Sequence, residues 1–79
     1  MNILAIYDNG AKTLDRYTVY LDYIEKPGVY ACFCMDASCR SVAMHAMGML
    51  GVHNGKKIAY KELPDACKNT LEQLNYTEL

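Results

Sequence analysis

The feature that most constrains the fold is the segment at residues 16–24, in which residue types alternate from Tyr17 to Tyr23. One face of this segment would carry Tyr17, Val19, Leu21 and Tyr23, and the other would carry Thr18, Tyr20 and Asp22. Alternation with a period of two is typical of a β-strand with one face against a core. Asn9-Gly10 comes just before it, and this dipeptide tolerates the positive φ of a tight connection. The sequence therefore predicts a β-ribbon with a loop near residues 8–15.

Two further strands are predicted around this one. Residues 2–7 are short and mostly apolar, and residues 29–35 alternate again. Between the strands, Pro27 presets φ for the second turn position and Gly28 accepts the positive φ that a type II turn needs next. Three consecutive strands joined in this way form an antiparallel meander.

The periodicity then changes, and two helices are predicted. Asp36 or Ser38 can cap a helix that runs to about residue 50, where Gly51 would end it. The apolar stripe of this helix would be Val42, Ala46, Met49 and Leu50. After a short extended piece at 57–61, the second helix opens at Leu63-Pro64-Asp65 and repeats apolar residues at Leu63, Cys67, Leu71 and Leu74.

These elements predict one small α+β domain over residues 1–79. Its order is β-β-β-α-α, a three-stranded antiparallel meander with two helices packed on one face. A chain of 79 residues has no material for a second core. Its apolar stretches at 3–7 and 42–52 are too short to span a membrane or to serve as a signal peptide. We therefore expect a cytoplasmic protein with reduced thiols.

The cysteines are the first candidate site. Cys32, Cys34, Cys39 and Cys67 could supply four soft ligands to zinc. The C-x-C spacing is not the C-x-x-C knuckle that wraps a metal with its own turn, and buried thiols are ordinary core residues. We therefore expect no metal and no other cofactor. Cys39, in the first turn of the predicted helix, is a candidate reactive thiol, but neither it nor His45 or His53 belongs to a recognisable catalytic set.

Aromatic and charged residues supply the remaining candidates. Tyr20 and Tyr30, on the outer face of the predicted sheet, could act as aromatic anchors for a partner. The seven tyrosines, together with Arg16, Arg40 and several lysines, could instead form a stacking platform for single-stranded nucleic acid. Tyrosines are also ordinary strand residues. The formal charge is -1, from 8 basic and 9 acidic residues, which argues against nucleic acid. Four charges gather at the predicted loop, Asp8, Lys12, Asp15 and Arg16, and form either a binding surface or a solvated hairpin end.

The opening segment resembles a group of small phage- and plasmid-encoded proteins. Residues 7–19 read Y-D-N-G-A-K-T-L-D-R-Y-T-V, and members of the group begin Y-D-N-G-G-K-T-x-D-R-Y-T-V. They often continue to G-K-[KR]-I and L-P, which correspond here to residues 55–58 and 63–64. This chain departs from the group at residues 36–40. The resemblance implies an accessory protein of a mobile element, in a bacterial host cell.

Accessory phage proteins of this size commonly inhibit host defence systems, and anti-CRISPR proteins are the best-known type. We therefore expect a non-enzymatic protein that binds a host protein, such as a defence effector complex. The expected contact residues are Asp8, Lys12, Asp15, Arg16, Tyr20 and Tyr30. The alternative is a small regulator that binds zinc, through the four cysteines, or nucleic acid.

Overall fold

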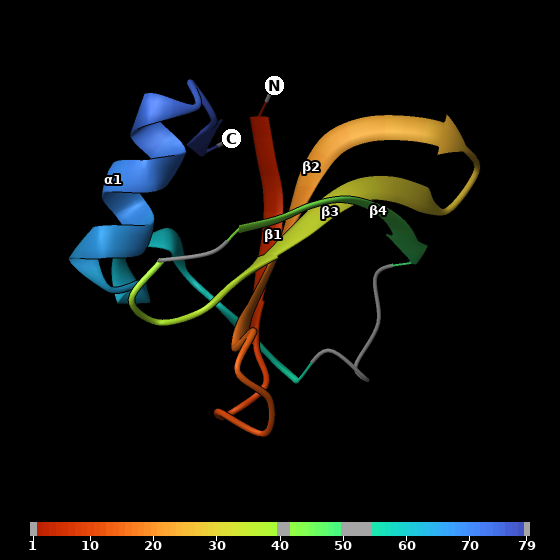
Figure 1. Ribbon diagram of the computed structural model, residues 1–79. Coiled ribbons are helices and arrows are strands. Elements are labelled where there is room, and N and C mark those ends of the chain that lie inside the picture. Colours follow the sequence, from red (N-terminus) through yellow and green to blue (C-terminus); the bar gives the residue numbers. More distant parts are fainter. Residues whose placement is uncertain (1, 40–41, 50–54, 79) are drawn as a thin grey trace.

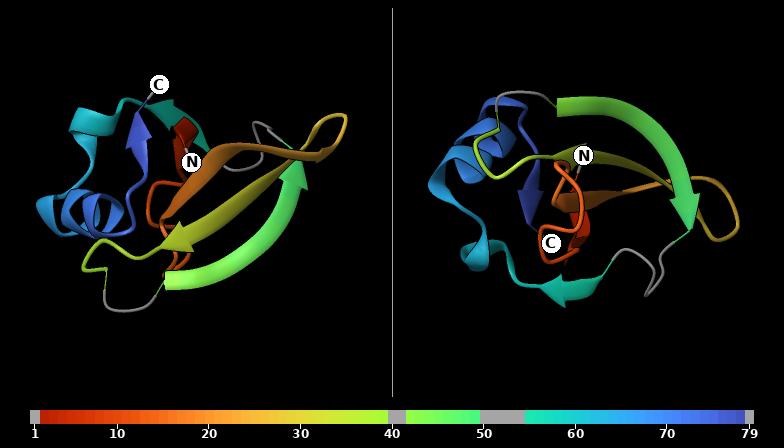
Figure 2. Two further views of the ribbon diagram at one scale, coloured as in Figure 1. Left: turned by 90° about the horizontal axis from the view of Figure 1, so that it is seen from above. Right: turned by 60° about the horizontal axis from the view of Figure 1, so that its bottom comes forward.

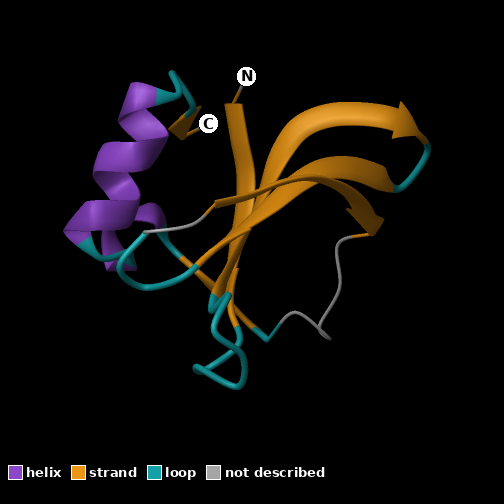
Figure 3. Ribbon diagram, viewed as in Figure 1, coloured by secondary structure: helices purple, strands orange, loops and turns teal. Residues whose placement is uncertain are grey.

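The computed structural model describes residues 2–39, 42–49 and 55–78 (Figure 1). Its strands are β1 (Asn2–Asp8), β2 (Tyr17–Lys26), β3 (Val29–Met35), β4 (Val42–Met49), β5 (Lys56–Ile58) and β6 (Thr77–Glu78). The α-helix α1 spans Asp65–Gln73 and follows a 3-10 turn at Tyr60–Glu62. The described part of the chain is therefore α+β, with one α-helix beside a larger sheet (Figure 3).

The strands form one sheet in the order β4-β3-β2-β1-β5. Each of the first three strands pairs antiparallel with the next along the chain, so β1 to β4 form a meander. Both short C-terminal strands lie on the remaining edge of β1, where β5 pairs antiparallel with its end and β6 pairs parallel with its start. The longer strands are strongly curved, and α1 lies at one end of the sheet (Figure 2).

Prediction of the first three strands is confirmed. The third has the predicted bounds, and the second begins and ends within two residues of its prediction. Pro27 and Gly28 form the turn between them, and Gly28 has a φ of 80°. The helix predicted after Leu63-Pro64-Asp65 is also present as α1. Leu63, Cys67 and Leu71 are buried there, whereas Leu74 is 37% exposed.

The helix predicted over residues 36–50 is wrong, because this region contains β4. In a nearly continuous apolar run the period of a helix and that of a strand fit equally well, so periodicity alone could not decide. Strand β4 pairs with β3 from Val29↔Met49 to Met35↔Val42. Gly48 of this strand lies beside buried side chains of β2 and β3, since a Cβ there would lie in ordinary contact 3.4 Å from Cys32 Sγ and 3.7 Å from a ring carbon of Tyr20. Gly51, the predicted helix end, and Leu50 lie outside the described residues.

Apolar side chains gather in two clusters. The larger lies between the sheet and α1, and includes Ile3, Ile6, Tyr17, Val19, Leu21, Phe33, Met35, Leu63, Cys67 and Leu71. The smaller consists of Ala5, Tyr20 and Cys32, with Tyr7 and Tyr30 packed against it. The inward face predicted for β2 is thus confirmed from Tyr17 to Leu21 and wrong at Tyr23, which is 54% exposed. The pairing of β2 shifts in register after Tyr20, so the alternation does not continue to the strand's end.

Candidate functional site

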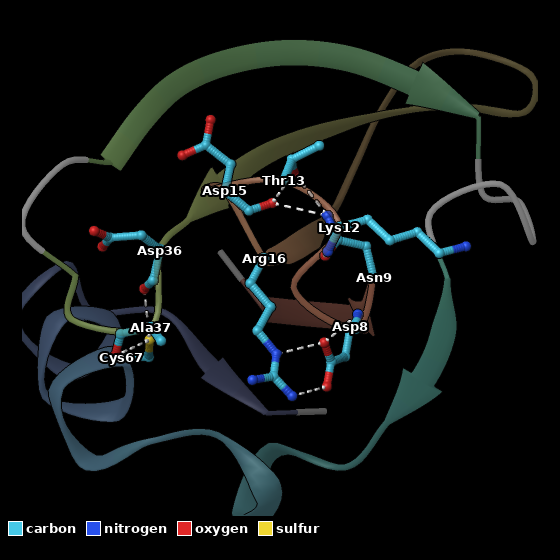
Figure 4. Close-up of polar contacts among 10 residues, drawn as sticks. Asp8, Asn9, Lys12, Thr13, Asp15, Arg16, Asp36, Ala37 and Cys67 are labelled. Atoms are coloured by element: carbon cyan, nitrogen blue, oxygen red, sulfur yellow. Dashed lines mark hydrogen bonds and ion pairs between the residues drawn. The ribbon is translucent and has the colours of Figure 1, made fainter.

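The loop between β1 and β2 is held together by the side chain of Asn9. Its Nδ2 donates hydrogen bonds to Thr13 Oγ1 at 2.8 Å and to Asp15 O at 3.2 Å. Its Oδ1 accepts a hydrogen bond from the Lys12 N–H at 3.1 Å. The Asn9 N–H also donates to Arg16 O at 3.0 Å and closes the base of the loop (Figure 4). One amide side chain therefore gives this loop a defined shape, as is typical of Asn in turns.

The backbone of the loop uses the positive φ that its sequence allows. Gly10 has a φ of 75°, as expected from the Asn9-Gly10 dipeptide, and Ala11 follows with a φ of 65°. A residue with a side chain is uncommon in this conformation, and the hydrogen bonds from Asn9 to Lys12 and Thr13 span Ala11 and hold it there.

An ion pair fastens the two ends of the loop. Arg16 Nε donates to Asp8 Oδ1 at 2.7 Å, and Arg16 Nη2 donates to Asp8 Oδ2 at 2.9 Å. The Gly10 N–H donates to Asp8 Oδ1 at 2.8 Å, and the Arg16 guanidinium lies over the Tyr17 ring, 5.2 Å from its centroid. The hydrogen bond from Arg16 lowers the pKa of the Asp8 carboxyl below its ordinary 3.8; Gly10 and Lys56 act in the same direction, and burial opposes them. The two parallel hydrogen bonds between the guanidinium and the carboxylate fix the relative orientation of Arg16 and Asp8.

An open groove of about 520 Å³ lies between this loop and the turn after β3. One wall consists of residues 11–14 and Arg16, and the other of Asp36, Ala37 and Ser38. Figure 4 shows these two segments facing each other. On the second wall, Ser38 Oγ donates to Asp36 Oδ2 at 2.9 Å. The carboxylate of Asp36 is only 8% exposed and is thus part of the wall's internal structure.

Leu14 is the most exposed large apolar residue in the described part of the chain. Its exposed fraction is 79%, although both loop segments beside it are held by hydrogen bonds. It lines the groove together with Lys12, which is also exposed. The site thus presents one apolar and one cationic side chain on a loop of fixed shape.

The predicted contact residues fall into two groups. Asp8, Lys12, Asp15 and Arg16 lie together at the loop, as the sequence predicted. The predicted outward position of Tyr20 is wrong, because this residue is 2% exposed and belongs to the smaller cluster. Tyr30 is half-buried against the same cluster and does not line the groove.

Sequence analysis missed Leu14 and the wall formed by Asp36, Ala37 and Ser38. The signal for Leu14 was an apolar residue alone within a polar turn. Predicting the wall would have required predicting β4 as a strand. Residues 36–38 then form a turn at the same end of the meander as the β1–β2 loop.

The four cysteines do not come together. Cys32 is buried in the smaller cluster, and Cys34 Sγ lies 3.6 Å from Thr18 Oγ1. Cys39 and Cys67 belong to the other cluster, near Asp36. Across the described ranges, no three histidine, cysteine, aspartate or glutamate side chains are grouped as metal ligands would be. The four-cysteine zinc set is therefore not assembled.

Other predicted chemistry also changes with the fold. Cys39 lies in the turn between β3 and β4 with a φ of 55°, so the argument from a helix N-terminus is wrong. His45 lies in β4 and not in a helix, and His53 is outside the described residues. Tyr7 packs edge-on against Tyr20, with ring centroids 5.7 Å apart, so these two rings do not form an open stacking platform.

Comparison with known proteins adds no relative. The chain matches no protein family, no curated protein and no solved structure. Within the residues described, no helix has the length and apolar character needed to cross a membrane.

Proposed function

We propose that this protein is a non-enzymatic binding module that recognises a partner protein through the β1–β2 loop and the adjoining groove. The observation that carries this proposal is Leu14, an apolar side chain 79% exposed on a loop whose shape is fixed by hydrogen bonds. Burying a leucine side chain contributes about 1.5–3 kcal/mol. A rigid loop also loses little conformational entropy on binding, which favours affinity.

The charges of the loop have different roles in this proposal. Arg16 is engaged with Asp8, so the pair maintains the loop and leaves little free charge. Lys12 donates only its backbone N–H within the described structure, and its side chain is exposed. We therefore assign recognition to Leu14 and Lys12, and shape to Asp8 and Arg16.

We further propose that the partner is a component of a bacterial defence system and that the protein inhibits it by occupancy, in the manner of anti-CRISPR proteins. This part rests on the resemblance of residues 7–19 to phage and plasmid accessory proteins. An interface of standard size buries about 800 Å² on each partner, and it requires no catalytic group. The bacterial cytoplasm is the compartment that this role requires.

The test compares two double variants in a phage protection assay. The first is Lys12→Ala with Leu14→Ala. The matched control is Ile24→Ala with Lys26→Ala, which removes an exposed aliphatic side chain and an exposed lysine from the opposite end of β2. Each protein is expressed in isogenic hosts with and without each defence system, and phage plaques are counted. Affinity purification with mass spectrometry identifies the host partner.

The parent and the control variant should restore plaque formation in a defence-positive host, and the loop variant should lose at least tenfold. A loss of about 1.4 kcal/mol of binding gives that factor. Equal plaquing by parent and empty vector across CRISPR types and other defences would refute the inhibitor role. A partner that binds both double variants equally well would refute the assignment to the loop. A salt-dependent shift with single-stranded nucleic acid, or stoichiometric zinc, would instead support the regulator alternative.

A further inference from the structure

Two cysteines that are distant in sequence meet behind the second wall of the groove. The carbonyl oxygen of Asp36 accepts a hydrogen bond from the Cys39 N–H at 3.1 Å and another from the Cys67 thiol at 3.4 Å. Cys67 Sγ also lies 4.0 Å from Ala37 O (Figure 4). Cys39 packs against the apolar cluster that contains Cys67, and it is among the groups that raise the pKa of the Cys67 thiol. The turn after β3 and the helix α1 therefore meet at this pair of thiols.

We propose that Cys39 and Cys67 form an oxidation site, at which a small-molecule disulfide such as oxidised glutathione converts the two thiols into an intramolecular disulfide. The bond would join the turn at residues 36–39 to α1. Because Asp36, Ala37 and Ser38 form one wall of the groove, oxidation would fix that wall to the helix.

The two cysteines differ in access, and this sets the order of the steps. Cys67 is fully buried and burial raises the pKa of its thiol to about 12, with further contributions from Cys39 and Asp36. Cys39 is only partly buried, although its Sγ lies 3.5 Å from Met35 Sδ. The attacking species in exchange is the thiolate, which must also reach the reagent. Cys39 therefore reacts first.

In the first step the Cys39 thiolate attacks one sulfur of glutathione disulfide. The S–S bond of glutathione breaks, one glutathione leaves as a thiolate, and Cys39 carries the other. The Cys67 sulfur then attacks the Cys39 sulfur and displaces the second glutathione, whose departing sulfur takes the Cys67 proton. Two protein thiols are oxidised and one glutathione disulfide is reduced to two thiols.

Peptide mapping can identify this bond without ambiguity. The reduced, folded protein is incubated with oxidised glutathione, alkylated, and digested with trypsin and Asp-N protease. Cleavage at Asp36, Arg40, Asp65 and Lys68 isolates Cys39 in peptide 36–40 and Cys67 in peptide 65–68, whereas Cys32 and Cys34 remain together in peptide 22–35. We expect the intact protein to lose the mass of two hydrogen atoms and peptides 36–40 and 65–68 to be linked.

Thermal unfolding supplies the second measurement, with Cys39→Ser as the test variant and Cys34→Ser as the matched control. A disulfide that closes a loop of about 30 residues should raise the unfolding temperature of the parent by about 10–20 °C, and dithiothreitol should reverse the rise. Cys34→Ser should show the same rise and Cys39→Ser none. Cys67→Ser removes the other thiol and should also abolish the rise. Cys67 is buried, so this variant could fail to fold, but Cys39 is only partly buried and Cys39→Ser gives the result by itself.

Three results would overturn the proposal: an unchanged mass after oxidation, a lasting glutathione adduct on Cys39, or a link from either peptide to 22–35. An equal rise in the unfolding temperature of Cys39→Ser would do the same. None of these outcomes depends on which partner the loop binds, so the oxidation site and the proposed function are tested separately.

Discussion

Replacement of Gly55 by alanine tests how closely the start of β5 approaches the base of the loop. Gly55 has a φ of 96°, and a Cβ placed there would overlap the carbonyl oxygen of Asp8 and lie 2.7 Å from Asn9 Cα and 2.8 Å from Asp8 C. All of these are backbone atoms, so no flexible side chain can move aside. The neighbouring pair Asp8↔Lys56, which joins β1 to β5, would have to shift.

The magnitude follows from two separate contributions. A side chain in the left-handed region costs about 1–2 kcal/mol, and forcing an extra methyl group into a packed contact costs about 1–3 kcal/mol more. Gly28 provides the matched control, because its φ is 80° but a Cβ there would meet nothing within 4 Å. We therefore expect Gly28→Ala to lower the free energy of unfolding by about 1–2 kcal/mol and Gly55→Ala by about 2–5 kcal/mol. For a domain of this size the total is about 4–12 kcal/mol.

Urea unfolding followed by circular dichroism measures both variants. With a slope of about 1 kcal/mol per molar urea, the midpoint should fall by about 1–2 M for Gly28→Ala and by about 2–5 M for Gly55→Ala. Gly10→Ala, also at positive φ and in open space, should match Gly28→Ala. Equal losses at Gly55 and Gly28 would show that the close approach to Asp8 is absent in solution.

Three further predictions concern charge and burial. Asp8→Asn should lower stability at pH 7. The native pKa of Asp8 is depressed, so its contribution to stability is present above about pH 4 and is lost as the pH falls through the native pKa. Urea unfolding from pH 7 to pH 2 should therefore give free energies of unfolding for the parent and the variant that converge in acid. Tyr20→Ala should lower the free energy of unfolding by about 3 kcal/mol or more, whereas Tyr23→Ala, at a position 54% exposed, should lower it by less than about 1 kcal/mol. Equal shifts in the thermal unfolding temperature would contradict the burial of Tyr20. Leu71→Ala should lower the free energy of unfolding by about 2–5 kcal/mol, and Leu74→Ala should lower it clearly less, as measured by chemical denaturation. The reverse order would contradict the face of α1 that packs against the sheet.

The reliable parts of the sequence prediction were those with both a period and a turn signal. Strand β3 was placed with its true bounds because alternation began immediately after Pro27-Gly28. Helix α1 was placed because Pro64 preceded residues at helical spacing, and the spacing brought Cys67 and Leu71 into the core. In each case two independent local preferences agreed, which is the condition under which sequence specifies structure.

The wrong predictions concern segments whose conformation or burial depends on pairing with residues distant in sequence. The boundary signals around residues 42–49, Asp36 or Ser38 before them and Gly51 after them, fit a helix as well as a strand. Pairing with the edge of β3 determines their conformation. Tyr20 was assigned to the outside because a second apolar cluster could not be anticipated from β2 alone. Its burial depends on Ala5 and Cys32, which come from two other strands.

The groove shows how one misassigned element conceals a site. In an antiparallel meander, the connections from β1 to β2 and from β3 to β4 lie at the same end of the sheet, and the turn from β2 to β3 lies at the other. If a helix followed β3, as the sequence predicts, residues 36–38 would be its N-terminal cap, and nothing would place them beside another loop. A strand makes the same residues a turn beside the β1–β2 loop, where they form a wall of the groove with Leu14 and Lys12. The turn after β3 therefore faces the proposed contact loop. Substitutions at Asp36, Ala37 or Ser38 should alter the groove while the β1–β2 loop keeps its shape, so they should change the affinity for the proposed partner without changing the loop.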